Sequence, residues 1–265
     1  MPELPEVEYA ARLARLALEG RRISRVRVLH RSQRRALPVA AQRRVAGERV
    51  VAVNRRGKYQ VIRLGSGRAL VVHFRLNGDW AVRDAGAPLP PHARVVLELD
   101  TGASLVLVDS RALATITLHD AGEVLLAALG PEANSPAFNA TSLGAWFRTK
   151  RGPVKPALLD QRKVAGIGNI YASEALWYAR LDPRAAANRL GPAALRRLVL
   201  GVKRAMQKAL AHPERYYGAG GVSDAVRFNV YDREGRPCRR CGTPITRIVQ
   251  TGRSTYFCPR CASVR

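Results

Sequence analysis

The chain has 265 residues, and its 45 Lys and Arg against 20 Asp and Glu give a net charge of +25 and a pI near 11.3. No apolar run is long enough to span a bilayer, and the acidic start is unlike a signal peptide, so we expect a soluble protein. A basic excess of this size indicates a polyanionic partner. We expect nucleic acid rather than an anionic membrane, because no basic amphipathic helix carries an aromatic apolar face.

The first eight residues, MPELPEVE, combine two prolines with three acids. If the initiator methionine is removed, the chain begins with Pro2, whose terminal group is a secondary amine flanked by Glu3 and Glu6. Taken alone, the stretch indicates the lead-in to a helix over residues 6–18, because acids favour the positive end of a helix dipole.

Short β-rich runs separated by Gly, Pro, Asn and Asp follow as far as about residue 118, and they predict an antiparallel β-sandwich or a barrel. The runs are RISRVRVL, RVVAVNR, YQVIRL, ALVVHF, ARVVLEL, SLVLVD and ATITLH. Lys58 falls on a tight turn between two of them. His73, His92 and His119 share no metal spacing, so we assign them no role.

Beyond a predicted linker, GPEANSPAFN, the composition turns helical. Helices are expected in TSLGAWFRTKRG, in the unit from residue 154 to residue 181, and over residues 191–210. In that middle unit, VAGIG breaks the helix and Asn169 can cap the next one. Two glycines before a cap leave backbone N–H groups that can cradle a phosphate, although an ordinary turn between packed helices fits equally well.

All four cysteines lie in the last 28 residues, with the spacing C-x2-C, sixteen residues, C-x2-C. This spacing predicts one Zn²⁺ bound tetrahedrally, and four protein ligands make the site structural. The residues between the pairs predict two short strands around a Thr251-Gly252 turn. Disulfides are the alternative, but nothing suggests secretion. The expected ligands are Cys238, Cys241, Cys258 and Cys261.

Three motifs occur together in a fixed order: MPELPEVE, K-P-x-L-L-D-Q…G-I-G-N-I-Y-A-S-E-A-L, and the paired cysteines. Together they resemble the formamidopyrimidine-DNA glycosylase / endonuclease VIII family of bifunctional base-excision repair enzymes, over the whole chain and closer to the formamidopyrimidine branch. The resemblance implies an α+β fold: an N-terminal helix with a β-sandwich (1–129), a linker (130–139), a helix–two-turn–helix domain (140–234) and a zinc ribbon (235–265).

The resemblance also implies the chemistry. Pro2 would attack C1′ of the damaged nucleotide, expel the base and form a Schiff base, followed by β,δ-elimination. Glu3 would act as acid and base, and Glu6 as a supporting carboxylate. Lys58 would reach the DNA phosphates and the damaged base from the opposite wall.

The resemblance also implies which residues contact the DNA. Leu76, Arg111 and Leu113 stand at the positions that fill the void left by the extruded base, where the family usually has methionine, arginine and phenylalanine. Leucine at two of the three keeps an apolar plug but removes a stacking face worth about 1–3 kcal/mol per base. The phosphate ligands would be Lys155, Asn169 and Arg253.

The stretch from residue 216 to residue 235, where the family carries a lesion-capping loop, looks short and rich in glycine. The expected partner is duplex DNA with oxidised bases or abasic sites, bound by a monomer in a bacterial cytoplasm at the nucleoid. Three alternatives stay open: an endonuclease VIII-like preference for oxidised pyrimidines or hydantoins, a damaged-DNA-binding protein that does not cut, and an RNA-binding protein of ribosomal type.

Overall fold

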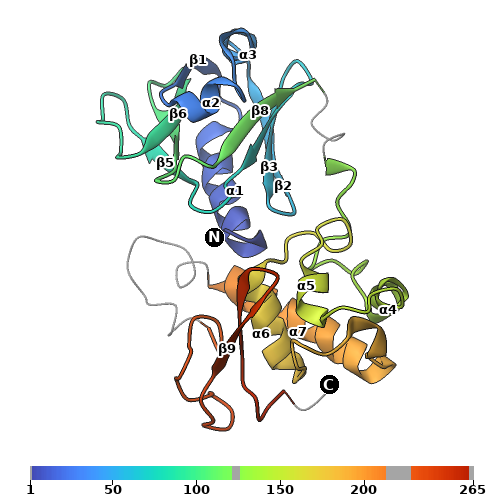
Figure 1. Cartoon of the computed structure of the whole chain (residues 1–265). Helices are drawn as coiled ribbons and strands as arrows, with labels where there is room; N and C mark the ends of the chain where they lie inside the picture. Colours follow the sequence, from blue (N-terminus) through green and yellow to red (C-terminus); the bar gives the residue numbers. More distant parts are fainter. Residues whose placement is uncertain (1, 121–125, 213–227, 263–265) are drawn as a thin grey trace. The chain divides into compact units, whose positions relative to one another are not determined.

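The computed structural model describes residues 2–120, 126–212 and 228–262 (Figure 1). The chain forms two compact units, each described here by itself. One consists of Met1–Pro2 and Glu6–Ala128, and the other of Glu3–Pro5 and Leu129–Arg265. The predicted four-part division of the chain stays a prediction.

Helix α1 spans Leu4–Leu18 and so begins two residues earlier than expected. Pro5 is compatible with the first turn, because an N–H there has no partner within the helix. The Leu4 N–H instead donates to the Gly166 carbonyl at 3.1 Å. Val7, Ala10 and Ala14 form part of the buried stripe of the helix.

Two four-stranded antiparallel sheets follow, in the orders β2-β3-β4-β8 and β1-β6-β7-β5. Their buried strands are rich in Val, Ile and Leu, as expected for sheets that pack on a core. The antiparallel prediction is confirmed. The strands are β1 Ile23–Val28, β2 Val50–Arg56, β3 Tyr59–Leu64, β4 Ala69–His73, β5 Asp79–Arg83, β6 Ala93–Leu99, β7 Ser104–Val108 and β8 Thr115–His119.

Three elements of the first unit were not predicted: β5, α2 (Arg31–Arg34) and α3 (Val39–Val45). Strand β5 has one large buried side chain, Trp80, and is specified by its pairing with β7. Helices α2 and α3 are short and contribute one buried side chain each.

The second unit is built on helices α4 (Ala140–Phe147), α5 (Val154–Leu158), α6 (Asn169–Ala179) and α7 (Pro192–Ala211), with a 3₁₀ turn, η2 (Ala187–Arg189). Helix α6 is buried on nearly every side and packs against α7. Gly201 permits that approach, since a Cβ there would lie 2.5 Å from the Ala175 carbonyl oxygen.

The segment predicted as a linker packs into this unit rather than crossing solvent. Ala133 and Phe138 are buried in its core, and Ala133 N–H donates to the Ala165 carbonyl at 3.0 Å. Asn139 caps α4 in a reciprocal box with Ser142.

The C-terminal hairpin pairs β9 (Thr246–Gln250) with β10 (Arg253–Phe257). Thr251 and Gly252 form the turn with φ of 46° and 73°, which confirms the predicted hairpin. In the described part of the chain, no helix is long and apolar enough to cross a membrane.

Candidate active site

Glu3 is fully buried, and its carboxylate caps helix α6 from a distant point of the sequence. It accepts hydrogen bonds from the backbone N–H groups of Gly168 at 2.6 Å, Ile170 at 2.8 Å and Tyr171 at 3.3 Å. These are the N–H groups that a helix start leaves without partners, and the positive end of the helix dipole attracts the carboxylate. Residue 3 is thereby fixed in place.

This cap corrects two expectations for the stretch before α6. The Gly168 N–H and the first N–H groups of the helix, proposed as a phosphate cradle, donate to Glu3 instead. The N–H of the other glycine, Gly166, donates to Gln161 Oε1 at 3.0 Å. Asn169 does not cap the helix: it is the first helical residue, and Gly168 stands at the cap position without a side-chain bond. The sequence could not reveal this, because the true cap lies more than 160 residues upstream.

Asn169 instead joins a buried polar network with Lys155 and the zinc hairpin. The Lys155 ammonium donates to Asn169 Oδ1 at 2.6 Å, Thr255 Oγ1 at 2.7 Å and the Ser254 carbonyl at 3.0 Å. The Asn169 amide donates to the same Ser254 carbonyl at 2.9 Å. The network therefore connects the starts of α5 and α6 with β10.

Burial lowers the pKa of Lys155, although the side chain is still mostly protonated near pH 7. Desolvation lowers the pKa of Lys155 to about 8; the Arg253 charge also lowers it, whereas the Glu3 carboxylate opposes the shift. Arg253 itself stands at the exposed hairpin tip.

Tyr231 is a site residue that the sequence reasoning missed. Its hydroxyl shares a hydrogen bond with the Asn169 side chain, and burial, followed by the Glu3 charge, raises the pKa of Tyr231 to about 12. The phenol is therefore neutral near pH 7. The Glu174 carboxylate accepts N–H bonds from Asn229, Val230 and Tyr231 at 2.8–3.1 Å, which fixes the segment. The sequence signal that could have identified Tyr231 is its place as an aromatic residue shortly before the cysteine pairs.

In the first unit, Lys58 lies in the two-residue turn between β2 and β3, as predicted. His73 lies nearby: burial, with the charges of Arg75 and Lys58, lowers the pKa of His73 to about 4. This neutral ring packs on Tyr59 at 4.5 Å between centroids, and its Nδ1 accepts the Arg75 N–H at 2.9 Å. His73 thus fixes a loop in which Arg75 has a φ of 57°.

That loop carries Leu76 and is bonded to the loop carrying Arg111 and Leu113. Asn77 Nδ2 donates to Ser110 Oγ at 3.3 Å, so the structure brings the two loops together. Leu76 is half-buried, whereas Arg111 and Leu113 are exposed.

Pro2 and Glu6 flank the start of α1. Pro2 is half-buried and Glu6 is buried in the first helical turn. Met1 and residues 216–227 of the predicted lesion-capping loop lie outside the described residues.

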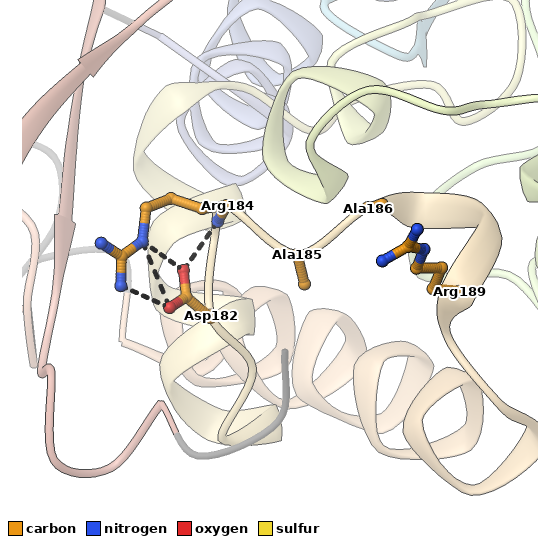
Figure 2. Close-up of a pocket in the computed structure, with 5 residues that line it drawn as sticks. All are labelled: Asp182, Arg184, Ala185, Ala186 and Arg189. Carbon is orange, nitrogen blue, oxygen red and sulfur yellow. Dashed lines mark hydrogen bonds and ion pairs between the residues drawn. The ribbon is translucent and has the colours of Figure 1, made fainter.

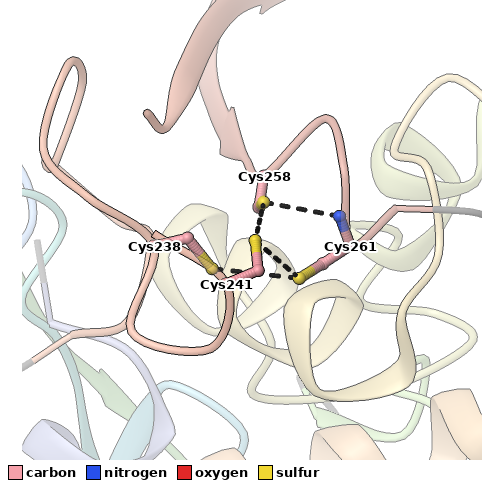
Figure 3. Close-up of side chains that lie close together, drawn as sticks. All are labelled: Cys238, Cys241, Cys258 and Cys261. Atoms are coloured by element: carbon pink, nitrogen blue, oxygen red, sulfur yellow. Dashed lines mark hydrogen bonds between the residues drawn. The ribbon is translucent and has the colours of Figure 1, made fainter. Parts of the chain in front are cut away.

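The four cysteines form a compact cluster (Figure 3). They are free thiols, with Sγ–Sγ distances of 3.4 Å for Cys241–Cys261, 3.5 Å for Cys241–Cys258 and 3.9 Å for Cys238–Cys261. Tetrahedral zinc with Zn–S bonds of about 2.3 Å spaces its sulfurs about 3.8 Å apart, so the donor set fits one Zn²⁺. Four thiolates complete the coordination, and the zinc is structural.

A surface cavity of about 440 Å³ contains none of the predicted site residues. Its lining side chains are drawn in Figure 2. Arg184 Nη2 bonds Asp182 Oδ2 at 2.6 Å, and its guanidinium lies 5.1 Å from the Phe257 ring centroid. These contacts support the hairpin. The lining residues are Asp182, Arg184, Ala185, Ala186 and Arg189.

A buried carboxylate near the start of the chain, bonded to the first turn of a helix in the unit that also carries the zinc hairpin, is the arrangement of the zinc-ribbon DNA glycosylases. Three family descriptions match the chain: "Formamidopyrimidine-DNA glycosylase N-terminal domain" over residues 1–116, "Formamidopyrimidine-DNA glycosylase H2TH domain" over 129–217, and "Zinc finger found in FPG and IleRS" over 235–264.

Curated relatives agree. Formamidopyrimidine-DNA glycosylase of Gluconobacter oxydans is 39% identical over 98% of this chain and 99% of its own. That of Moorella thermoacetica is 42% identical over 94% of each chain. The chain therefore belongs to the formamidopyrimidine-DNA glycosylase family, and it is a DNA glycosylase with abasic-site lyase activity.

Solved structures show the same fold with DNA bound. MutM in complex with DNA containing carbocyclic 8-oxo-G has a TM-score of 0.90 at 29% identity, covering 99% of this chain and 100% of that one. Lactococcus lactis Fpg with abasic-site DNA has a TM-score of 0.88 at 27% identity, covering 98% and 99%. The α+β fold class is confirmed.

Proposed function

We propose that this chain excises oxidised bases from duplex DNA and cleaves the resulting abasic site through the nitrogen of Pro2. The observation that carries the proposal is the burial of Glu3 on the N-terminus of α6 through three backbone hydrogen bonds. Pro2 is bonded directly to this firmly held residue, which supports a defined position for its nitrogen during the reaction. Proximity and orientation of this kind are large contributions to catalysis.

The reaction follows from the chemistry of a secondary amine. The Pro2 lone pair forms a bond to C1′ as the bond from C1′ to the base breaks, and the base leaves with a proton. Opening of the sugar ring gives an iminium ion, which acidifies the C2′ hydrogens. Loss of a C2′ proton expels the 3′ phosphate, and a second elimination expels the 5′ phosphate. Glu3 moves the protons in these steps, and Glu6 supports the amine.

The remaining residues hold the DNA in this proposal. Lys58, at the β2–β3 turn, contacts phosphates and the extruded base, while Asn169 and Arg253 contact phosphates beside the lesion. Support for Arg253 is its exposed place at the hairpin tip. Leu76, Arg111 and Leu113 fill the void in the duplex.

The neighbour structures hold DNA with 8-oxo-G, Fapy-dG or an abasic site. We infer that abasic-site cleavage is the most robust activity of this chain, because it needs only the Pro2 chemistry and bent DNA. Leu113 is apolar but not aromatic, unlike the phenylalanine usual at this position of the family. Oxidised pyrimidines should therefore be tested as substrates too. Faster cleavage of thymine glycol than of 8-oxoguanine duplexes would support the endonuclease VIII-like alternative.

The curated relatives come from bacteria. We infer that the chain acts as a monomer in the bacterial cytoplasm, on the nucleoid. Its net charge of +25 supports association with DNA. We also keep as a proposal the division into a catalytic domain (1–129), a linker (130–139), a DNA-binding domain (140–234) and a zinc ribbon (235–265).

Borohydride trapping tests the catalytic proposal. The mature protein should give a covalent adduct with abasic duplex DNA, because reduction fixes the iminium link. Glu3→Gln should slow base excision about 10²–10⁴-fold, and Pro2→Gly, which replaces the secondary amine by a primary one, should lower the adduct yield.

Glu8→Gln is the matched control, because Glu8 lies on the same helix in a partly exposed ion pair with Arg55. Processed protein that binds the abasic duplex but yields no adduct would contradict the proposal and leave DNA binding as the function.

A further inference from the structure

We propose that Lys155 is a positioning residue that fixes the zinc hairpin on the start of α6, and that it does not touch DNA. This inference rests on the proposed function, in which Asn169 and Arg253 contact phosphates. It replaces the sequence-based expectation that Lys155 is itself a phosphate ligand.

The surroundings of Lys155 account for all three of its ammonium protons. The side chain is 1% exposed, and its protons go to Asn169 Oδ1, Thr255 Oγ1 and the Ser254 carbonyl. An ammonium has three donors and no acceptor, so none is left for a DNA oxygen.

The acceptors come from two elements, α6 and β10, and the hairpin alone could not align β10 with α6. The Ser254 carbonyl receives a second bond from Asn169 Nδ2, so two donors fix the peptide next to Arg253. Asn169 in turn is oriented by Lys155 at its oxygen. One buried cation therefore holds both proposed phosphate ligands in a single arrangement.

The charge of this cation gives the arrangement a measurable signature. The Lys155 pKa of about 8 reflects burial, with Arg253 on β10 acting in the same direction and Glu3 acting against it. The other titratable group of the network, Tyr231, has a pKa of about 12 and stays neutral.

DNA phosphates placed at Arg253 and Asn169 add negative charge near Lys155 and favour its protonated form, so the pKa of Lys155 is higher in the complex than in the free protein. Affinity is then greatest below pH 8 and falls as the pH rises through that value.

The experiment measures binding of a duplex with an uncleavable abasic-site analogue. Lys155→Met removes the ammonium at similar length, and Lys163→Met is the charge-matched control, because Lys163 is exposed in the same unit. Each substitution is made in two backgrounds, one that keeps Arg253 and one that carries Arg253→Ala. Zinc content and circular dichroism confirm folding. Thr255→Val, which removes one acceptor only, is the milder second variant.

Lys155→Met should weaken binding about tenfold relative to Lys163→Met, and much less than tenfold once Arg253 is Ala, because a residue that acts through another is not additive with it. The fall in affinity between pH 7 and pH 9 should be reduced in Lys155→Met and retained in Lys163→Met. Thr255→Val should show a smaller loss with the same dependence on Arg253.

Equal binding by the two lysine variants, or losses that multiply fully with Arg253→Ala, would overturn the inference. Full multiplication would mean that Lys155 contacts a phosphate independently. These measurements use binding alone, whereas the Pro2 proposal stands or falls on trapping by the wild type, so the two failures are separable.

Discussion

Asp109 shows how a single buried carboxylate can shape the loop that carries Arg111 and Leu113. It is fully buried and accepts N–H bonds from Arg111 at 2.9 Å, Leu113 at 2.6 Å and Ala114 at 2.7 Å. Ala112 between them has a φ of 55°, which L residues rarely adopt. The side chains of Arg111 and Leu113 are therefore directed outward by their backbone.

We expect Asp109→Ala to lower the free energy of unfolding by about 1–3 kcal/mol, because it leaves N–H donors without their acceptor. Base excision should fall more than abasic-site cleavage, since extrusion of the base is the step in which Arg111 and Leu113 are proposed to fill the void. Urea denaturation and single-turnover assays on both substrates check this.

Asp84→Ala, at an exposed aspartate of the same unit, is the control. Unchanged excision in a destabilised Asp109→Ala protein would show that the loop does not need this conformation.

At the residue scale, the sequence predicted the metal ligands better than it predicted which side chains contact one another. The cysteine spacing was sufficient for the zinc cluster, because tetrahedral geometry leaves little freedom. Tyr231 and His73 were missed, since each depends on contacts with residues distant in sequence. The capping role of Asn169 was wrong because Glu3, from the chain start, competes for the same N–H groups.

At the scale of elements, the turn before α6 is as constrained as the helix itself. Gly166 has a φ of +99°, and a Cβ there would lie 2.5 Å from Leu4 Cδ1. The Gly166 carbonyl accepts the Leu4 N–H, so this glycine positions Leu4, the residue that follows Glu3.

Gly166→Ala should therefore destabilise the protein by at least about 1–3 kcal/mol through backbone strain alone. It should also reduce trapping of abasic DNA, because Leu4 cannot move without Glu3. Thermal unfolding and borohydride trapping measure the two effects.

Gly152→Ala is a matched control, since a Cβ there meets nothing within 4 Å. An alanine at 166 that leaves trapping and stability at control values would refute the constraint.

The elements with a strong hydrophobic period were predictable from sequence, whereas the short strand β5 was not. Helix α7 was expected over residues 191–210 and spans Pro192–Ala211, because its apolar stripe repeats over many turns. Strand β5 is five residues long with mixed polarity, so only its register with β7 identifies it.

At the scale of the whole molecule, the net charge of +25 predicts binding that depends steeply on salt. Each phosphate contact contributes about −0.9 to the slope of log affinity against log salt. Arg253→Ala should reduce the magnitude of the slope by about 0.9, since it removes one such contact. Titrations at several salt concentrations measure this.

Arg162→Ala, at an exposed arginine paired with Asp160, is the control and should leave the slope unchanged. The same slope for Arg253→Ala as for the wild type would exclude a phosphate contact at the hairpin tip.

The cap of α6 by Glu3 has a consequence for biosynthesis. Glu3 and Gly168 are separated by 165 positions, and ribosomes deliver the amino end first. While the earlier part of the nascent polypeptide emerges, the Glu3 carboxylate has none of the N–H groups of α6 to bind. If Pro2 is the nucleophile as proposed, catalytic competence arises late in translation, and truncated products released before residue 171 carry Pro2 without the helix start that fixes Glu3 beside it.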